Sequence, residues 1–339
     1  MSNNSIRTLN ANLIAELLRG LEKEIVDEIS LAYQTHGNQM SAIPQSVFLR
    51  FPENSTDRII ALPAYLGGDF NVGGIKWISS FPGNINRGKD RASAAIILNS
   101  LEDGRPVAFL EGAVISAQRT AAGAALAART LRKSPSHTCL AVIGCGVINY
   151  EIVKFISATC PELANLIVYD KDPGRASGFA NRCRSSFDEL EVKIVSNLDE
   201  ALAGAPLISI ATTAPTPHIT DLSACQKDAL LLHISLRDIS AETILTCENV
   251  VDDVDHVCRE NTSLHLAEKL SGNRDFINGA LPDILLGRVP APAHNKRTIF
   301  SPFGLGILDL ALAKLVLNLA RDKGVGAVIE SFVAEPRLS

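Results

Sequence analysis

The sequence lacks the cysteine pairs and long apolar runs that would mark a disulfide-stabilised or membrane-spanning protein. Its seven cysteines include no Cys-x-x-Cys pair and show no regular spacing, and several lie inside apolar runs. This usage fits a reducing compartment better than a disulfide framework. No run reaches transmembrane length, and the first residues lack the apolar core of a signal peptide. We therefore expect a cytoplasmic protein.

Positive charge is also scarce. The chain has 32 Lys and Arg against 37 Asp and Glu, a net charge of −5 and no basic tract, so nucleic acid is not an expected partner. No Gly-x-Ser-x-Gly, His-Glu-x-x-His or phosphate-loop motif occurs. The acidic cluster from Asp252 to His256 matches no common ligand spacing, so we expect no metal. His233, inside an apolar run, is expected to be a satisfied core histidine.

What the chain does have is an ordered change of hydrophobic pattern. Residues 11–35 have helical spacing, and residues 43–116 hold short apolar runs separated by Gly and Pro, which predict an antiparallel sheet. The alanine-rich segment 116–129 predicts a helix. Between 138 and 255 strands alternate with helices, the pattern of a doubly wound parallel sheet. We expect these strands at 138–143, 166–169, 192–196, 207–213, 230–236 and 249–253.

The rest of the chain completes a two-domain organisation, which is the natural expectation for 339 residues. A loop rich in Pro, Gly and polar residues is expected at 272–300, followed by a closing helix at 310–319. The fold class is α/β, a doubly wound parallel sheet plus an α+β domain formed from both chain ends. We place the α+β domain at 1–119 with 308–339, and the doubly wound domain at 120–307.

The apolar run 138–143 ends at a Gly-x-Gly turn followed by an amphipathic segment, the order found in dinucleotide-binding domains. Gly144 permits the tight turn, and Gly146 lets backbone N–H groups approach a pyrophosphate at a helix N-terminus. Asn149 stands where the full fingerprint has its third glycine. Gly-x-Gly alone also fits a plain strand-to-helix turn. Asp170 ends the next strand-like run, where an acid can bind the ribose diol of a dinucleotide. An acid at this position also repels a 2′-phosphate, so NAD is favoured over NADP.

Three cations are candidates for binding an anionic substrate. Lys76 follows two glycines between apolar neighbours; in isolation a strand lysine points to solvent, but this setting also fits a buried lysine that binds a carboxylate or assists proton transfer. Arg50 ends an apolar run and Arg119 opens the alanine-rich helix, and each is either a surface arginine or an anion ligand. Thr120, in the first turn beside Arg119, would offer a hydroxyl and N–H groups to a phosphate.

Asp238 lies just past the strand expected at 230–236, where the catalytic residues of open α/β sheets gather. A helix N-cap is an equal alternative for this aspartate. Thr212 and Thr213 end the preceding strand in the same way, facing the place where a nicotinamide would lie.

Four segments of the chain carry a family resemblance: residues 73–77, 116–122, 142–146 and 303–311. Together they resemble the ornithine cyclodeaminase/μ-crystallin family over essentially the full length of the chain. The resemblance implies a Rossmann domain that binds NAD(P), a substrate domain that dimerises through its sheet, and redox chemistry on amino or imino acids. One departure is at Asp238, where the chain has Leu-Arg-Asp-Ile-Ser and the cyclodeaminases have Asp-x-Pro-Gly-Lys.

Within the family, residues 57–63, 74–78, 91–93, 96–99 and 251–253 are similar to dehydrogenases that cleave N-(2-amino-2-carboxyethyl)-L-glutamate to 2-oxoglutarate and L-2,3-diaminopropionate, for siderophore or other secondary-metabolite synthesis. In that reaction Arg50, Lys76 and Arg119 would hold the substrate carboxylates while hydride passes to NAD⁺. Lys76 and Asp238 would be catalytic, with Asp238 orienting or deprotonating the water that attacks the imine. The expected cofactor-binding residues are Arg119, Thr120, Gly144, Cys145, Gly146, Val147, Ile148, Asp170, Thr212, Thr213, Ser235, Gly304 and Asp309.

Three alternatives stay open at this point. An ornithine cyclodeaminase would recycle its hydride internally, so that no net NADH appears. An imine reductase or alanine-type dehydrogenase would consume NADH with a 2-oxo acid and an amine. A binding protein like μ-crystallin would hold the dinucleotide with little turnover.

Overall fold

The computed structural model describes residues 4–131, 138–292 and 296–334. It divides into two compact units, unit 1 with residues 1–119 and 305–339, and unit 2 with residues 120–304. The divisions fall between Arg119 and Thr120 and between Gly304 and Leu305. The sequence places the second division three residues later, between 307 and 308.

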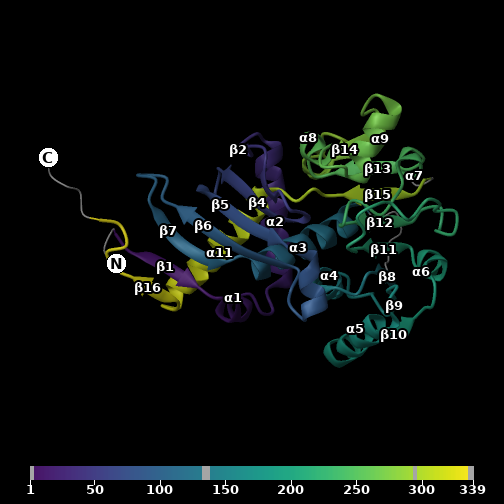
Figure 1. The fold of residues 1–339 in the computed structure, drawn as a ribbon, viewed down its shortest axis with the longest axis horizontal. Coiled ribbons are helices and arrows are strands. Elements are labelled where there is room, and N and C mark those ends of the chain that lie inside the picture. The colour runs from purple at the N-terminus through teal and green to yellow at the C-terminus, as the bar shows by residue number, and fades with distance from the viewer. Residues whose placement is uncertain (1–3, 132–137, 293–295, 335–339) are drawn as a thin grey trace. The chain divides into compact units, whose positions relative to one another are not determined.

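Unit 1 is built around an eight-stranded sheet with the order β16-β1-β7-β6-β5-β4-β2, to which β3 adds by pairing with β4. The long helix α11 packs against α2 and against β4, β5 and β6, as Figure 1 shows. The elements are β1 (Ile6–Leu9), α1 (Ala11–Leu17), α2 (Glu22–Gly37), β2 (Ser41–Ala42), β3 (Val47–Phe51), β4 (Asn54–Leu66), β5 (Val72–Ser80), the 3-10 helix η1 (Pro82–Arg87), β6 (Ala92–Asn99), β7 (Pro106–Glu111), α11 (Gly306–Asp322), β16 (Ala327–Ile329) and the start of α3 (Ala113–Leu131), whose residues from Thr120 on belong to unit 2.

The central strands of unit 1 alternate between a buried face and a more exposed one. Leu62 on β4, Lys76 on β5 and Ile96 on β6 lie directly opposite one another in one row, and all three are buried. Side chains directly opposite across paired strands lie on the same face of a sheet. The row therefore places a lysine among apolar residues on the face that α11 covers.

The antiparallel meander from β3 to β7 confirms the sheet expected at 43–116. Two other expectations for unit 1 differ. The single helix expected at 11–35 is two helices, because the chain turns at Gly20, whose φ of 79° is a left-handed conformation that favours glycine. The sheet also has a parallel pair, β1 with β7, and a last strand β16 that the apolar pattern does not mark.

Unit 2 is a parallel eight-stranded sheet with the order β10-β9-β8-β11-β12-β15-β13-β14, in which every pairing is parallel. This confirms the doubly wound α/β class. The elements are β8 (Cys139–Ile143), α4 (Val147–Thr159), β9 (Asn165–Tyr169), α5 (Pro173–Ser186), β10 (Glu191–Ile194), α6 (Leu198–Gly204), β11 (Leu207–Ile210), β12 (Leu230–His233), α7 (Ala241–Leu245), β13 (Glu248–Val251), α8 (Val254–Val257), α9 (Ser263–Ser271), β14 (Ile277–Ala280), α10 (Leu281–Leu285) and β15 (Thr298–Ser301).

The loop expected at 272–300 is wrong over much of its length, because it contains β14, α10 and the start of β15. Residues 293–295 of that loop lie outside the described residues. Strand β15 is four residues long and fully buried between β12 and β13, too short to show a pattern of its own. Among the described residues, no helix has both the length and the apolar character needed to cross a membrane.

Candidate functional site

The site residues of unit 1 gather around one buried carboxylate. Asp309, in the first turn of α11, is completely buried and lies 2.6 Å from Nζ of Lys76 and 3.1 Å from Nε of Arg119. The hydroxyl of Ser116 on α3 accepts a hydrogen bond from Lys76 at 3.2 Å and from Nη2 of Arg119 at 3.5 Å. Lys76 is only 2% exposed, so the expectation that a strand lysine points to solvent is wrong here.

Two cations share this single carboxylate, so the cluster carries a net charge of +1 (+2 from Lys76 and Arg119, −1 from Asp309). The pKa of Lys76 is lowered to about 8, because burial and, to a lesser extent, the charge of Arg119 lower it more than the charge and hydrogen bond of Asp309 raise it. Burial alone would raise the pKa of Asp309, but the charges of Arg119 and Lys76 and their hydrogen bonds outweigh it and lower the pKa. The cluster is therefore an anion-attracting centre with an ionised carboxylate inside it.

The position of Asp309 depends on two glycines just before it. Gly304 has a φ of 92°, and a Cβ on Gly306 would lie 3.3 Å from both the Cβ of Ala64 and the carbonyl of Leu62. Glycine at 306 thus lets α11 start close against β4. We predicted Asp309 as a cofactor-binding residue. Its Oδ2 accepts a hydrogen bond from Lys76 and its Oδ1 accepts one from Arg119, so Asp309 is the group that holds these two cations.

Arg119 does not lie at the start of its helix, as the sequence had suggested. Helix α3 starts at Ala113, and the carboxylate of Glu111 caps it by accepting the N–H groups of Ala113 at 2.6 Å and Val114 at 3.0 Å. Thr120 is therefore the eighth residue of α3, where backbone N–H groups are used in the helix's own hydrogen bonds. The expectation that Thr120 offers first-turn N–H groups to a phosphate is wrong, and only a role of its hydroxyl stays a prediction.

Arg50, the third predicted cation, lies on β3 on the same face of the sheet as Lys76. It pairs in register with Arg58 on β4, and Arg58 is four residues from Leu62, which is opposite Lys76. Its guanidinium lies 5.4 Å from the ring centre of Phe48. The structure thus places Arg50 on the lysine's face but not in the Asp309 cluster.

The phosphate turn of unit 2 has the geometry that a dinucleotide needs. Gly144 has a φ of 92°, and a Cβ there would meet the carbonyl of Ala211 at 2.6 Å, so only glycine fits. Gly146 is the N-cap of α4; no side chain caps this end, and a Cβ on Gly146 would meet nothing within 4 Å. The N–H groups of Val147 and Ile148 follow in the first turn of α4. The residues present therefore fit a pyrophosphate at this helix end.

Asn149 explains the missing third glycine. It is fully buried and donates from Nδ2 to the carbonyls of Ile143 at 3.0 Å and Gly144 at 2.6 Å, while its Oδ1 accepts the hydroxyl of Ser209 at 2.7 Å. The side chain ties the turn to strands β8 and β11. The close packing that the third glycine usually allows is thus replaced by hydrogen bonds.

Asp170 follows β9 and lies beside the turn. Its Oδ2 accepts the N–H of Cys145 at 2.8 Å, its Oδ1 accepts the N–H of Asp172 at 2.9 Å, and Nε of Arg175 is 3.8 Å from Oδ2. Burial, followed by the charge of Asp170, raises the pKa of the Cys145 thiol to about 12, so this cysteine is not a nucleophile. Cys145 contributes its backbone N–H to the turn.

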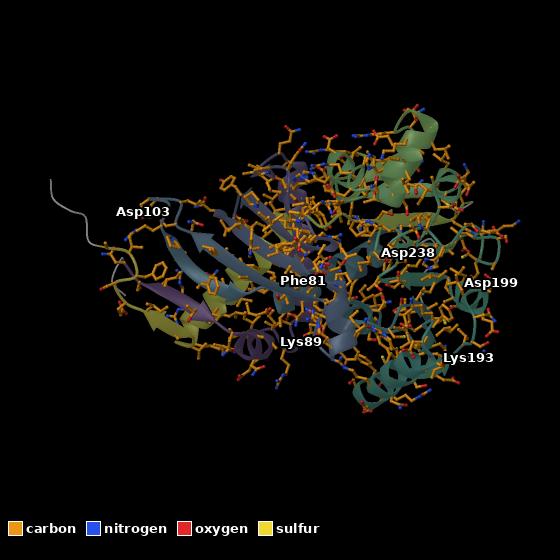
Figure 2. The ribbon with its side chains drawn as sticks, in the orientation of Figure 1. Phe81, Lys89, Asp103, Lys193, Asp199 and Asp238 are labelled. Carbon is orange, nitrogen blue, oxygen red and sulfur yellow. The ribbon has the colours of Figure 1, made fainter. Side chains whose placement is uncertain are left out.

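Asp238 is fully buried in unit 2, and Figure 2 shows it among the strands, in contrast to Lys193 and Asp199 at the periphery. Its carboxylate accepts hydrogen bonds from the hydroxyls of Thr212 and Ser235, and Nε2 of His233 lies 3.4 Å from Oδ2. Nδ1 of His233 is 3.2 Å from the hydroxyl of Ser301. Three neighbouring strands, β11, β12 and β15, therefore end in one connected polar network.

Burial alone would raise the pKa of Asp238, but the hydrogen bond and charge of His233 and the two hydroxyls lower it, so the carboxylate is ionised. The N-cap alternative for Asp238 is wrong, because Ser240 caps α7. Strands β11 and β12 end at Ile210 and His233, so Thr212 and Thr213 do not end their strand as expected, and Ser235 lies in a loop although it was expected inside the strand 230–236. Thr213 is exposed.

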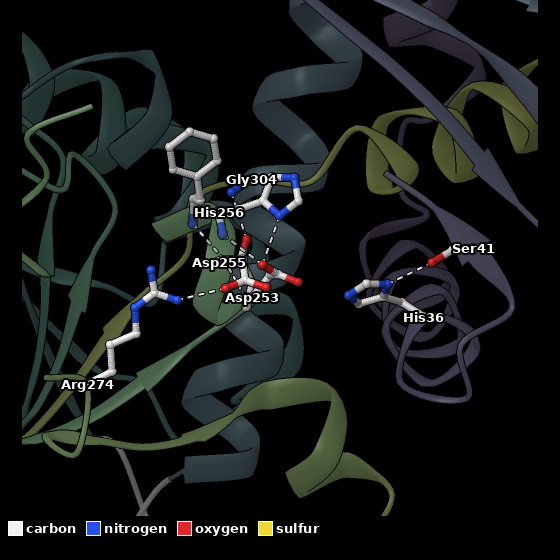
Figure 3. Close-up of polar contacts among 9 residues, drawn as sticks. His36, Ser41, Asp253, Asp255, His256, Arg274 and Gly304 are labelled. Carbon is white, nitrogen blue, oxygen red and sulfur yellow. Dashed lines mark hydrogen bonds and ion pairs between the residues drawn. The ribbon is translucent and has the colours of Figure 1, made fainter. Parts of the chain in front are cut away.

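The acidic cluster at 252–256 has structural roles within unit 2. Asp252 is buried, and its two oxygens accept the N–H groups of Phe303 at 2.8 Å and Gly304 at 2.7 Å, so the N–H of Gly304 is engaged. Asp253 caps α8 and lies 2.8 Å from Nδ1 of His256 (Figure 3). Asp255 pairs with Arg274 at 2.7 Å (Figure 3).

Gly304 was predicted as a cofactor-binding residue. Its backbone N–H is bonded to Asp252, and its cofactor role stays a prediction.

The expectation that His233 is a satisfied core histidine is confirmed, because it is fully buried and bonded to Ser301 and Asp238. Sequence reasoning missed three residues that complete these networks. Two of them, Ser116 and Ser301, act through partners distant in the sequence, and Glu111 caps a helix that starts earlier than its alanine-rich part. For Glu111 a signal is present, because an acid two residues before a helix of good formers marks an N-terminus. For the other two the sequence carries no such signal.

The chain matches known proteins over nearly its full length. The model of the ornithine cyclodeaminase/mu-crystallin family matches residues 15–324. An N-((2S)-2-amino-2-carboxyethyl)-L-glutamate dehydrogenase of Staphylococcus aureus is 29% identical over 91% of this chain and 93% of its own. An alanine dehydrogenase of Archaeoglobus fulgidus is 25% identical over 91% and 94%.

Among solved structures, the Thermococcus litoralis Delta(1)-pyrroline-2-carboxylate reductase in complex with NADH and L-proline has a TM-score of 0.88 at 24% identity, covering 95% of this chain and 99% of its own. This likeness supports the same fold for the whole chain. The match of the family model over most of the length decides the classification: the chain belongs to the ornithine cyclodeaminase/mu-crystallin family.

Proposed function

We propose that the protein is an NAD-dependent oxidoreductase that acts on the CH–NH bond of an amino or imino acid. The observation that carries this proposal is the buried cluster in which Lys76 and Arg119 share the one carboxylate of Asp309. Ser116 and Asp309 take two of the three N–H groups of Lys76 among the described residues, so one N–H is left for a ligand. A buried centre of net charge +1 suits the carboxylate that every amino acid carries.

The cofactor assignment depends on unit 2. The Gly144 turn and the end of α4 would hold the pyrophosphate, and Asp170 would bind the adenosine ribose and disfavour a 2′-phosphate. Bound NAD⁺ supplies a nicotinamide that accepts a hydride from carbon. Relatives with this cofactor, among them the T. litoralis reductase in complex with NADH, support the assignment.

Within this class we propose one reaction, the oxidative cleavage of N-(2-amino-2-carboxyethyl)-L-glutamate, and the S. aureus relative supports it. The Cα–H of the glutamate moiety leaves as hydride and the amine loses a proton, which gives an imine. Water adds to the imine carbon, and the C–N bond breaks to give 2-oxoglutarate and L-2,3-diaminopropionate. Per turnover, one NAD⁺ and one water are consumed, and one NADH and one H⁺ are formed. The diamine would feed siderophore or other secondary-metabolite synthesis.

In this reaction Lys76 and Arg119 bind the substrate carboxylate next to the reacting carbon, and Arg50 binds a second one. Asp238 orients the water. Its lowered pKa makes it a weak base, so we assign it mainly to positioning the water through an ionised acceptor. Thr212 and Ser235 hold the two carboxylate oxygens in place. Fixing the reacting groups in this way accounts for much of the expected acceleration.

The test is absorbance at 340 nm with NAD⁺ and synthetic N-(2-amino-2-carboxyethyl)-L-glutamate, with products identified by mass spectrometry. NADH formed in equal amount with 2-oxoglutarate and diaminopropionate is the expected result. Proline and ammonia from ornithine without net NADH would indicate a cyclodeaminase instead. NADH consumption with pyruvate and ammonia, or with Δ1-pyrroline-2-carboxylate, would indicate a dehydrogenase or imine reductase. NADH binding with no turnover of any of these would indicate a binding protein.

We also propose that unit 1 forms a homodimer through the exposed face of its sheet. Four large apolar side chains lie on the face opposite Lys76: Val47 is 65% exposed, Leu49 46%, Trp77 43% and Phe109 45%. Large exposed apolar side chains that gather on one face of a sheet are typical of an interaction site. The archaeal alanine dehydrogenase dimer with bound NAD, at a TM-score of 0.86, has the same fold.

A further inference from the structure

Unit 2 has a polar pocket built from residues that neither the cofactor nor the substrate assignment uses. Its volume is about 300 Å³, and it is formed by residues 220–223, helix α7 with its C-cap, and Arg297. This volume is at the small end of the range for ligand-binding pockets. The polar residues that line it include Thr220, Asp221, Ser223, Glu242, Thr246 and Arg297.

The pocket lies toward the edge of the parallel sheet opposite Asp238. Arg297 comes directly before β15 and Thr246 precedes β13 by two residues, so both lie where strands begin. Asp238 and the Gly144 turn instead follow the ends of β12 and β8. Because every pairing in this sheet is parallel, strand beginnings and strand ends lie at opposite edges, and cofactors bind at the ends. The pocket is therefore separate from the candidate active site.

Arg297 is oriented to bind a carboxylate in this pocket. Its Nη2 donates to the carbonyls of Ser223 at 3.3 Å and Cys225 at 2.8 Å, and its Nε donates to the carbonyl of Cys225 at 3.3 Å. These bonds fix the guanidinium, while its Nη1 makes no hydrogen bond or ion pair within the described part of the chain. A fixed guanidinium with free N–H groups is suited to a carboxylate.

Two carboxylates line the same pocket. Asp221 accepts the N–H of Ser223 at 2.8 Å and also its hydroxyl, and it forms no ion pair with Arg297. Glu242 on α7 is exposed, and no group among the described residues bonds to its carboxylate. The lining thus carries a net charge of −1 (−2 from Asp221 and Glu242, +1 from Arg297). A ligand with one carboxylate and two ammonium groups matches these three charges.

One wall of the pocket is hydrogen-bonded to the main chain of Asp238. The hydroxyl of Thr243 donates to the carbonyl of Thr220 at 2.7 Å, and the N–H of Ser240 donates to the carbonyl of Ile219 at 2.9 Å. The N–H of Ile219 in turn donates to the carbonyl of Asp238 at 2.8 Å. A ligand that holds this wall against α7 therefore also restricts the chain at Asp238.

We propose that the pocket is a regulatory site for a small diamino acid, and that ligand binding there makes the chain at Asp238 more rigid. Arg297 binds the carboxylate of the ligand, and Asp221 and Glu242 bind its two ammonium groups. The site does not depend on the proposed reaction. Where that reaction holds, its product L-2,3-diaminopropionate belongs to this ligand class, so the enzyme would respond to its own product.

The test measures binding to the full-length protein by isothermal titration calorimetry. The probes are L-ornithine, L-norvaline, which has the same carbon chain without the second amine, and putrescine, which lacks the carboxylate. The variants are Glu242→Gln and Glu242→Lys. Glu189→Gln is the matched control, because Glu189 is an exposed acid of unit 2 outside the pocket. Hydrogen–deuterium exchange with mass spectrometry follows the main chain of residues 233–240 with and without L-ornithine.

The wild type should bind L-ornithine about threefold or more tighter than L-norvaline or putrescine, the size expected for one charge pair near the surface. Glu242→Gln should lose the preference over L-norvaline, Glu242→Lys should bind L-ornithine more weakly still, and Glu189→Gln should keep the wild-type affinity. L-Ornithine should slow amide exchange in residues 233–240 of the wild type but not of Glu242→Lys.

Absence of L-ornithine binding, or wild-type affinity in both Glu242 variants, would overturn the site, because the second result places the ligand elsewhere on the protein. Binding that depends on Glu242 but leaves exchange at 233–240 unchanged would overturn the regulatory role. Both effects as expected, with no NADH formed in the 340 nm assay, would instead reject the proposed reaction alone.

Discussion

Nζ of Lys76 lies 2.6 Å from Oδ2 of Asp309, although 233 residues separate them in the chain. One partner is on a sheet strand and the other is in the first turn of the last long helix, so this contact joins the N-terminal and C-terminal parts of unit 1. Removing one partner of a buried ion pair leaves an uncompensated charge. Asp309 has two such partners, Lys76 and Arg119.

Asp309→Asn should therefore destabilise unit 1 by about 3–5 kcal/mol, because two buried cations lose their one carboxylate. The sole tryptophan, Trp77, lies on β5 of unit 1, so its fluorescence during urea unfolding reports on this unit. The double variant Asp309→Asn with Lys76→Met is the control and should recover part of the loss. A single variant as stable as the wild type would mean that the ion pair does not hold α11 on the sheet.

The pH dependence of activity follows from Lys76. Its pKa is lowered to about 8, so the amine is cationic below this pH and loses its proton above it. If the cation binds the substrate carboxylate, kcat/KM falls as the pH rises through about 8, mainly through a rise in KM. Lys76→Arg should move this falling limb to higher pH, because arginine keeps its charge. Initial rates between pH 6 and 10 would check this; activity that rises through pH 8 would make neutral Lys76 a base.

Much of the fold follows from local patterns. The alternating strands and helices of unit 2, the Gly144 turn and the position of Asp170 depend on residues close together in the chain, and these predictions are confirmed in the structure. The two glycines and the apolar neighbours of Lys76 indicate a buried lysine, as found, whereas the helix-start position that singled out Arg119 is wrong, because α3 starts at Ala113. The sequence therefore identifies the cations and the turn.

The partners of these residues were not predictable, because they come from distant segments. Nothing near Lys76 indicates Asp309, and nothing near Asp238 indicates Ser301, which reaches the network through His233. Short buried strands such as β15 were missed because four residues, Thr-Ile-Phe-Ser in β15, are too few to show a period. The start of α3 was misplaced because alanine density marks the middle of that helix better than its capped end.

Asp238→Asn should reduce kcat by about 10² to 10⁴, because the amide cannot hold a water as an ionised acceptor does. NADH affinity should stay near the wild-type value, since the pyrophosphate turn is made by other residues. His233→Gln tests the network independently: it removes the ring that bridges Asp238 and Ser301, and should lower kcat less than Asp238→Asn does. Single-turnover kinetics and NADH fluorescence titration would check both. Full turnover by Asp238→Asn would exclude this residue from the reaction.

Asp170 should set the preference for NAD over NADP. Replacing it by Asn keeps an oxygen that can accept the Cys145 N–H but removes the charge that repels a 2′-phosphate. We expect the ratio of kcat/KM for NAD⁺ to that for NADP⁺ to fall about tenfold or more, in part because Arg175, 3.8 Å from Asp170, would then be available to a phosphate. The double variant Asp170→Asn with Arg175→Gln should lose the gain for NADP⁺. A wild-type enzyme that uses both cofactors equally would contradict the ribose assignment.

Charged residues on the exposed sheet face of unit 1 should prevent the proposed dimerisation. The double variant Leu49→Glu with Val47→Glu places two charges on the sheet face that a second copy covers in the proposed homodimer. Dimerisation would then bury unpaired charges, which is costly. The variant should elute as a monomer in size-exclusion chromatography with light scattering, at concentrations where the wild type is a dimer. Leu270→Glu is the matched control, because Leu270 is 55% exposed on α9 of unit 2 and should leave the mass unchanged. A dimer that survives the double change would place the interface elsewhere, and a monomeric wild type would reject the dimer itself.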